Sequence, residues 1–365
     1  MIQLHELDSI CLIPSEVNQG HPGNRVDFTT VDALDVGGLG RSLPIFTSPM
    51  DSVVDSSKAE MYQGKGIRPI IPATESLEIR LNYCQYVFSA FSLSEVEECF
   101  LKNPVAGDSQ FHICFDVGNG HDQQLLNLGR EMNRTYGRRA ILMGGNVGYP
   151  ETYKEYALHG FDYMRVGISS GSLVDKDKYG FHYPMASLLE DIKNYRTSGG
   201  GKGLRYVRVI ADGGISCPLD IVKAIALGAD YVMVGRELAR TIEAAGPVYK
   251  SQKNGAGQPE IVQVHAGPFI GKSGKEIRSE GLSRLYVGNT SDTVRMRRAG
   301  MTDEEEWENS LARYTVLDSC KNFVNVDCTL DEWLEEFKGC AYNAFMMTGS
   351  LKWDEFRKNV RYACI

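Results

Sequence analysis

The sequence predicts a (β/α)8 barrel, in which parallel strands alternate with covering helices. Three observations support this fold: eight short apolar runs, spacers of helical length between them, and glycine with small polar residues directly after several runs. Val, Ile and Phe dominate most runs, as they do in strands that are covered on both faces. The expected strands are Leu43–Thr47, Ile67–Ala73, Tyr86–Ala90, His112–Val117, Ala140–Gly145, Tyr163–Ile168, Arg208–Ala211 and Tyr231–Val234.

Helical periodicity in the spacers supports the alternation of strands and helices. After the fourth run, one helical face is apolar and comprises Leu125, Leu126, Leu128 and Met132. Pro69 and Pro72 interrupt the apolar pattern, so we expect the second and third strands to be the least regular. Residues 9–15 predict a short strand and a loop over the bottom of the barrel. We expect one domain over residues 1–365, with a loop or flap region at 248–330.

The composition is that of an ordinary globular protein and argues against several functional classes. Hydrophobic residues make up 42% and charged residues 24% of the 365 residues. A net charge of −8 and a pI near 5.5 argue against nucleic acid or an anionic membrane as the main partner. No apolar run is long enough to span a bilayer, and the start of the chain lacks the pattern of a signal peptide. Nine cysteines without metal-ligand spacing indicate reduced thiols in a cytoplasmic protein.

Three successive strand ends carry short polar loops that contain glycine. Residues 169–172, Ser-Ser-Gly-Ser, follow the sixth run, Asp212-Gly-Gly-Ile follows the seventh, and Gly235-Arg236 follows the eighth. Such loops expose backbone N–H groups, which bind anions such as phosphate. Because the C-terminal ends of barrel strands meet at one face, we expect a single anion-binding site there.

The loop after the sixth run resembles the active-site loop of the IMP dehydrogenase and GMP reductase family. In that family Arg-Val-Gly-x-Gly-x-Gly-Ser-x-Cys ends in the nucleophilic cysteine, whereas the tenth residue counted from Arg165 is Val174. The segment Thr47-Ser-Pro-Met-Asp-Ser-Val53 resembles the family's Ser-Pro-Met-Asp-Thr-Val, and Tyr286-Val-Gly-Asn-Thr-Ser291 resembles the loop that reaches the purine base. The resemblance covers most of the chain and is weakest over 74–110 and 248–330. It implies a barrel without the regulatory two-repeat (CBS) insertion of the dehydrogenases.

The resemblance also implies roles for individual residues. Ser172, Gly214 and Gly235 match the phosphate-binding positions, and Asp212 matches the acid that binds both ribose hydroxyls. The other implied substrate-binding residues are Ser48, Met50, Asn146, Arg236, Tyr286 and Gly288. The implied cofactor-binding residues are Asp116, Gly118 and Asn119, and the implied K+ site is the backbone at Ser169 and Gly171.

Several of these residues have a competing structural interpretation. Arg236 replaces a small residue of the family, and it either pairs with phosphate or points to solvent or a neighbouring subunit. Asn146 is either a ligand-binding amide or a polar turn residue. We interpret Asp116 as a site residue, with catalysis among its candidate roles, rather than as a helix cap. Cys217 is interpreted as a structural thiol at a helix start, and His182 as a hydrogen-bonded loop histidine.

The resemblance implies a purine nucleoside monophosphate as substrate, NAD or NADP as cofactor, and a homotetramer. Catalysis in the family needs a thiolate that attacks purine C2, and Val174 supplies none. Three functions therefore stay open. The first is an NAD(P)-dependent oxidoreductase of a purine nucleotide or modified purine that works without the cysteine. The second is a catalytically silent nucleotide sensor or partner subunit, and the third is a lyase or transferase acting on a phosphorylated purine-like ring.

Overall fold

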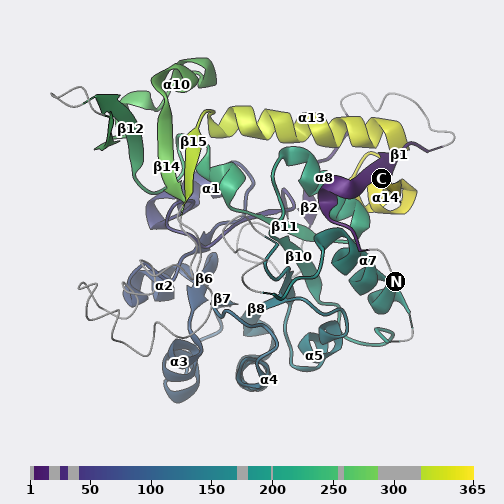
Figure 1. Ribbon diagram of the computed structural model, residues 1–365. Helices are drawn as coiled ribbons and strands as arrows, with labels where there is room; N and C mark the ends of the chain where they lie inside the picture. Colours follow the sequence, from purple (N-terminus) through teal and green to yellow (C-terminus); the bar gives the residue numbers. More distant parts are fainter. Residues whose placement is uncertain are drawn as a thin grey trace.

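The computed structural model describes residues 4–15, 25–31, 41–170, 180–198, 200–253, 259–286 and 322–365. At its centre lies an eight-stranded parallel sheet with the order β4-β11-β10-β9-β8-β7-β6-β5 (Figure 1). Its strands are β4 (Ile45–Thr47), β5 (Ile70–Ile71), β6 (Phe88–Phe91), β7 (Phe111–Phe115), β8 (Ala140–Val147), β9 (Tyr163–Val166), β10 (Arg208–Asp212) and β11 (Tyr231–Val234).

The sheet closes into a barrel between β4 and the residues that lead into β5. Thr47 N donates to Arg68 O and Arg68 N donates to Ile45 O, each at 2.9 Å. The predicted (β/α)8 barrel is therefore confirmed. The second strand has only two residues, because Pro69 and Pro72 flank it and supply no N–H donors to the ladder.

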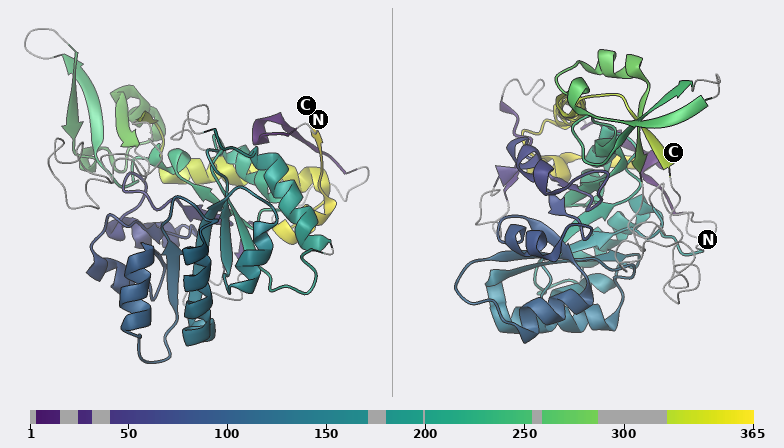
Figure 2. Two further views of the ribbon diagram at one scale, coloured as in Figure 1. Left: turned by 60° about the horizontal axis from the view of Figure 1, so that its bottom comes forward. Right: turned by 90° about the vertical axis from the view of Figure 1, so that its left-hand side faces the viewer.

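Helices follow the strands and cover the barrel (Figure 2). Their starts follow from local sequence: an Asp55 oxygen accepts from Lys58 N at 3.1 Å, and Ser92 and Glu95 form a capping box. The predicted apolar face at 125–132 is buried, which confirms that assignment. The covering helices are α1 (Ser56–Gly64), α2 (Leu77–Tyr83), α3 (Leu93–Val96), α4 (Gln123–Tyr136), α5 (Thr152–Leu158), α7 (Met185–Thr197), α8 (Pro218–Leu227) and α9 (Arg236–Ala239).

Aromatic side chains fill the interior of the barrel. Phe46 makes edge-to-face contacts with the rings of Phe88, Tyr163 and Tyr231, at centroid distances of 5.8, 5.8 and 5.2 Å. All four rings are buried. The interior is therefore a packed core rather than a channel, and a ligand site has room only at the strand ends.

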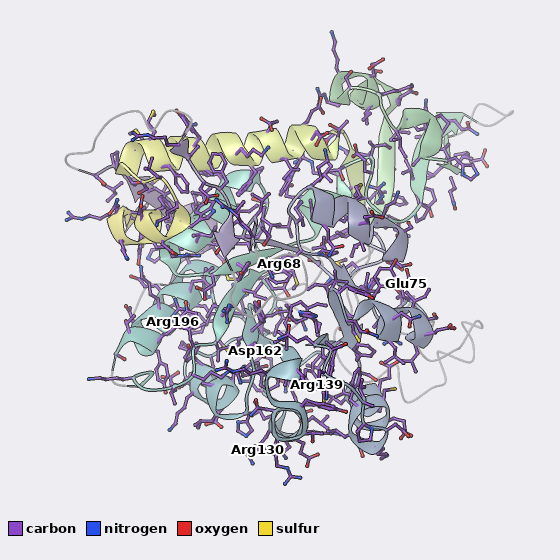
Figure 3. All side chains as sticks on the ribbon, turned by 180° about the vertical axis from the view of Figure 1, so that it is seen from behind. Arg68, Glu75, Arg130, Arg139, Asp162 and Arg196 are labelled. Carbon is purple, nitrogen blue, oxygen red and sulfur yellow. The ribbon has the colours of Figure 1, made fainter. Side chains whose placement is uncertain are left out.

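Charged residues near the N-terminal ends of the strands make structural contacts. Asp162, directly before β9, accepts from Leu142 N at 2.9 Å and pairs with Arg205, while burial raises its pKa. Arg196 on α7 donates to Asp230 at 2.8 Å. Figure 3 labels Asp162 and Arg196 as seen from behind. These pairs occupy the N-terminal side of the barrel, and ligand sites of such barrels lie at the opposite strand ends.

A second sheet stands away from the barrel (Figure 2). It is antiparallel, with the order β13-β12-β14-β15. We call this sheet and α10 (Gly274–Glu280) the arm; its strands are β12 (Val248–Lys253), β13 (Pro259–Val264), β14 (Leu282–Tyr286) and β15 (Asn322–Val326). On its inner face, Ile277 of α10 clusters with Val248 and Leu282.

Arg284 on β14 ties the arm to the barrel. Its side chain is fully buried, and burial lowers its pKa to about 10. The guanidinium donates to four carbonyl oxygens at and after the end of α9, at 2.5–3.3 Å: those of Ala239, Thr241, Ile242 and Ala244. One buried side chain thus satisfies a whole turn of backbone acceptors.

We expect Arg284→Met to lower the free energy of unfolding by about 2–3 kcal/mol, because the carbonyl oxygens lose a charged donor. Urea unfolding at neutral pH measures the loss. Lys250→Met is the control: Lys250 also lies in the arm, but its pair with Glu280 is partly exposed, so its removal should cost less than about 1 kcal/mol. Equal losses in the two variants would contradict the role given to Arg284.

The two ends of the chain pair with each other. β1 (Ile10–Ile13) runs antiparallel to β16 (Arg361–Cys364), so the strand expected within residues 9–15 is present. Figure 1 shows α13 (Leu330–Thr348) running from the arm towards this pair, followed by α14 (Trp353–Asn359). None of the described helices has the length and apolar character needed to cross a bilayer.

Candidate functional site

A polar cluster at the C-terminal ends of the strands is centred on Asp212, the last residue of β10. Asn146 Nδ2 on β8 donates to Asp212 Oδ2 at 2.8 Å and to Gly167 O at 3.1 Å. Arg165 Nη1 on β9 lies 3.9 Å from the same carboxylate oxygen. Because β8, β9 and β10 are neighbours in the sheet, the parallel register brings together side chains that are far apart in the sequence.

The Asp212 carboxyl is ionisable in a largely buried setting. Its side chain is 19% exposed. Burial raises the pKa of Asp212, and the lowering effects of Arg165 and the Asn146 amide do not cancel that rise. An acid with a raised pKa at the end of a barrel strand is typical of a functional site.

Arg165 lies below Asp212 inside the barrel. Its side chain is buried, and Nη2 donates to Phe115 O at 2.9 Å and Gly145 O at 3.2 Å. Burial by itself would lower the pKa of Arg165, but nearby Cys114, Asp212 and Asp116 raise it above the ordinary value. In the sequence, Arg165 is only the first residue of a motif. The signal that it had a larger role was a single charge within an apolar strand, two residues after inward-facing Tyr163.

Residues from three segments meet at Gly235, between β11 and α9. A Cβ built on Gly235 would lie 2.4 Å from Tyr286 Oη and 2.9 Å from Ser48 Oγ, so a side chain cannot fit. Burial raises the pKa of Tyr286, and its hydroxyl therefore stays protonated and able to donate at neutral pH. Met50 is buried in the same turn after β4, with its N–H bonded to Ser48 O at 2.8 Å.

Arg236 begins α9 beside this point, and its side chain is exposed. It forms no ion pair with any residue in the described ranges. Its charge acts on Tyr286, which places the guanidinium near the Gly235 junction. Of the two interpretations of Arg236, this position is compatible with pairing to a bound phosphate.

The loops after β9 and β10 approach each other. A Cβ on Gly214 would lie 3.5 Å from Ser170 O, and the φ of +73° at Gly214 favours glycine. Ser169 also has a positive φ, 55°, which is uncommon for a non-glycine residue. Its hydroxyl is buried and has no hydrogen-bond partner within the part of the chain that the structure describes.

The three residues expected to bind the cofactor lie in one loop but differ in their exposure to solvent. Asp116 directly follows β7 and is partly buried, with its N–H bonded to Phe91 O at 2.8 Å. Gly118 and Asn119 are exposed, and Asn119 Oδ1 accepts from His121 N at 3.0 Å. Gly120 of the same loop donates its N–H to Asn146 O at 3.0 Å, so the loop runs beside the Asp212 cluster, with Gly118 and Asn119 on its exposed part.

The part of the barrel that carries the Asp212 cluster is similar in sequence to known proteins. A sequence model described as the IMP dehydrogenase / GMP reductase domain matches residues 108–258, which contain β7 to β11. GMP reductase 2 of Homo sapiens is 36% identical over 136 residues, 37% of each chain. GMP reductase of Vibrio cholerae serotype O1 is 28% identical over 271 residues, 69% of this chain and 75% of the relative. Over this region the chain is similar to the IMP dehydrogenase / GMP reductase family.

This similarity agrees with the resemblance at the strand ends, but the aligned fraction differs from one relative to another. The alignments to GMP reductase 2 of Homo sapiens and Mus musculus each span only 37% of the relative's length. Four of the residues that we expected at the site, Gly171, Ser172, Val174 and Gly288, lie outside the described residues.

The cysteines closest in the sequence to the family's nucleophile position have structural surroundings. Cys114 lies inside the barrel, fully buried, and burial raises its pKa to about 11. Cys217 precedes α8 and is partly buried, and burial raises its pKa as well.

His182 is hydrogen-bonded through both ring nitrogens. Among the described residues no cluster of His, Cys, Asp or Glu could hold a metal ion.

Proposed function

We propose that this chain binds a purine nucleoside monophosphate at the C-terminal face of its barrel and acts on it as an NAD(P)-dependent oxidoreductase by a route that does not use a cysteine at the family position. The observation that supports this most is the Asp212 cluster. Three adjacent strands hold a carboxylate with a raised pKa at the barrel mouth. The purine nucleotide is proposed as the ligand class because of the similarity to the IMP dehydrogenase / GMP reductase family.

The carboxylate is arranged to accept hydrogen bonds from a ribose. Both contacts that the described residues make with it, from Asn146 and Arg165, involve Oδ2. Oδ1 is left for a ligand hydroxyl, and a carboxylate has lone pairs for two such donors. Asn146 and Arg165 then act by fixing the carboxylate rather than by touching the sugar.

The phosphate is assigned to the junction at Gly235. Ser48 and Tyr286 bring hydroxyl groups there, α9 begins at the next residue, and exposed Arg236 adds a positive charge. Gly214 adds a backbone N–H from the neighbouring loop. Hydroxyl, amide and guanidinium donors are the groups that bind phosphate in proteins.

The cofactor is assigned to the loop after β7, where Asp116, Gly118 and Asn119 lie. Gly118 and Asn119 are exposed and so accessible to a ligand, and the Asp116 carboxylate can accept from a ribose or an amide. A nicotinamide cofactor supplies or accepts hydride. The choice between NAD and NADP, the K+ site at 169–171 and the homotetramer stay predictions.

A thermal-shift and calorimetry panel tests the proposal. IMP, GMP, XMP and their 2′-deoxy forms are measured with and without NAD(H) and NADP(H). We expect stabilisation by at least one ribonucleotide, a further shift with one cofactor, and weaker binding of the deoxy form. If no purine nucleotide raises the melting temperature, the assignment of the ligand class fails.

Replacing Asp212 by alanine should weaken ribonucleotide binding by about 1.5–3 kcal/mol, or roughly 10- to 150-fold, because the ribose hydroxyls lose a charged acceptor. Calorimetry on the folded variant measures the loss. The 2′-deoxy ligand should lose less than the ribo form, since it has one hydroxyl fewer. Asp331→Ala, on the exposed side of α13, is the control and should bind normally. Unchanged affinity in Asp212→Ala would exclude the proposed placement of the ribose.

Ribonucleotide affinity should rise with pH through the pKa of Asp212, because the ligand needs the carboxylate. Since burial raises this pKa, the loss on acidification should begin above the range near about pH 4 where exposed aspartates titrate. Folding stability has the opposite sign: a raised pKa means that the folded protein holds the proton more tightly, so this contribution to stability is lost as pH rises. Calorimetry across pH measures the binding step. Asp212→Asn should lack that step while the ligand phosphate still titrates.

A second function, a silent nucleotide sensor or partner subunit, is favoured by Val174. Valine retains packing against a ring but offers no nucleophile. Nucleotide binding without a cofactor shift in the panel, together with no hydride transfer, would select this function over the first.

A further inference from the structure

We propose that Glu6 and His182 are positioning residues that hold together the two described ends of the loop after β9, residues 168–170 and 180–183, and thereby favour nucleotide binding. These ends lie between β9 and α7, and the segment between them contains Ser172, which we expect at the phosphate and which lies outside the described residues. The inference rests on the proposed function where it concerns affinity. The contact itself is a property of the chain without ligand.

His182 joins the two ends of this loop. Its Nδ1 lies 3.1 Å from Ile168 O, at the start of the loop, and its Nε2 lies 2.6 Å from Glu6 Oε1. Both ring nitrogens face oxygen acceptors, and a neutral ring could donate to only one of them. The ring is largely buried, with its side chain 18% exposed. His182 therefore fixes the distance between the start and the end of the loop.

Glu6 joins the loop end to α7. Its second oxygen, Oε2, accepts from Met185 N at 3.0 Å, at the first residue of the helix. The residue before the helix, Pro184, makes no side-chain cap. A carboxylate is favourable at a helix N-terminus because it satisfies a free N–H and interacts with the helix dipole. Glu6 thus supplies the missing cap although it lies 179 positions away from Met185 in the sequence.

The segment that carries Glu6 is itself anchored. His5 N donates to Ser187 Oγ at 2.8 Å, and Ser187 N donates to His5 O at 3.1 Å. Leu7 O accepts from Lys223 Nζ of α8 at 3.0 Å. β1 follows directly and pairs with β16. The Glu6 carboxylate is therefore held by secondary structure on both sides.

A cap on α7 would need only one oxygen of Glu6. The other oxygen is hydrogen-bonded to Nε2 of His182, and Nδ1 of the same ring is hydrogen-bonded to Ile168 O. The next residue, Ser169, has a positive φ of 55° and a buried hydroxyl. Uncommon backbone conformations persist where surrounding contacts determine them, and they concentrate at functional sites. Ser170 O, one residue further, lies against Gly214 of the phosphate-binding set.

Hydrogen exchange in the absence of ligand tests the contact. His182→Phe keeps a ring of similar size and removes both hydrogen bonds, and Glu6→Gln keeps an acceptor for Met185 N but loses the charge. In both variants the amides of residues 168–170 and 180–183 should exchange at least about tenfold faster, the loss expected for a charge-assisted hydrogen bond at a partly buried site. Tyr183→Phe is the matched control, because Tyr183 bonds only to Asp191 within the described residues, on α7 itself.

Exchange that stays at the wild-type rate in His182→Phe and Glu6→Gln, or that rises equally in Tyr183→Phe, would overturn the proposal. Calorimetry with GMP and IMP tests the functional part: a Kd at least about tenfold weaker in both variants, with urea midpoints close to wild type, is expected. Wild-type Kd values in both variants would overturn the positioning role. If the wild-type chain binds neither nucleotide, the proposed function fails, while the exchange measurement still decides the contact.

Discussion

A 6-chloropurine ribonucleotide is expected to leave the cysteines of the wild-type chain without a nucleotide-protected adduct, and to label Val174→Cys at the new side chain. A thiolate displaces the chloride of this reagent when it lies against the purine. The position that we align with the family nucleophile is Val174, Cys114 is fully buried with its pKa raised to about 11, and Cys217 lies before α8 with its pKa also raised by burial. None of these side chains supplies an exposed thiolate.

Peptide mass analysis after labelling, with and without excess GMP, gives the result directly. Val174→Ser is the matched control, because a hydroxyl of similar size is a poor nucleophile at neutral pH. Turnover by the family's covalent route should be lower by many orders of magnitude in the wild-type chain; loss of a covalent nucleophile costs about 10⁶-fold in a well-studied protease. Protectable labelling at an existing cysteine, with turnover lost in step, would mean that another thiol has taken over.

Arg165→Met is expected to lower the free energy of unfolding by about 3–5 kcal/mol at neutral pH, because it leaves the Asp212 carboxylate buried without its nearby positive charge. The methionine also leaves the carbonyl oxygens of Phe115 and Gly145 without the donor that they have now. The pKa of Asp212, already raised by burial, should rise further, since the guanidinium is the main group that lowers it.

The loss should shrink as the pH falls, because the protonated Asp212 no longer carries an uncompensated charge. Urea unfolding at several pH values measures this trend. The double variant Arg165→Met/Asp212→Asn should recover about 1–3 kcal/mol relative to the sum of the single changes, as expected for two groups in direct interaction. A deficit that is independent of pH, with additive single and double variants, would show that Arg165 acts only by packing.

The barrel could be predicted because each of its strands is marked by a short apolar run in the local sequence. Each of the eight strands was expected within a few residues of its observed position, since strands covered on both faces are continuous apolar runs. The boundaries of the second strand could not be predicted well. Pro69 and Pro72 limit hydrogen bonding to two residues, and Arg68 joins β4 instead by a separate bridge.

The candidate site could be predicted only in part. Asp212, Asn146 and Gly235 were expected from their motifs, and the structure brings Asp212 and Asn146 into contact and places Ser48 and Tyr286 at Gly235. Gly118 and Asn119 are exposed, and the next residue, Gly120, donates its N–H to Asn146 O at 3.0 Å. The role of Arg165 was missed, because a motif names a residue without giving the direction of its side chain.

The sequence by itself determined the fold class and the resemblance to the IMP dehydrogenase / GMP reductase family, because both depend on residue types and spacing along the chain; the alignment of Val174 with the family cysteine stays a prediction from that spacing. The tertiary structure alone decided which side chains share a carboxylate oxygen. Asn146 and Arg165 meet Asp212 through the register of three parallel strands, and Glu6 meets His182 across 176 positions. Such contacts depend on strand register and helix packing, and no local pattern in the sequence records them.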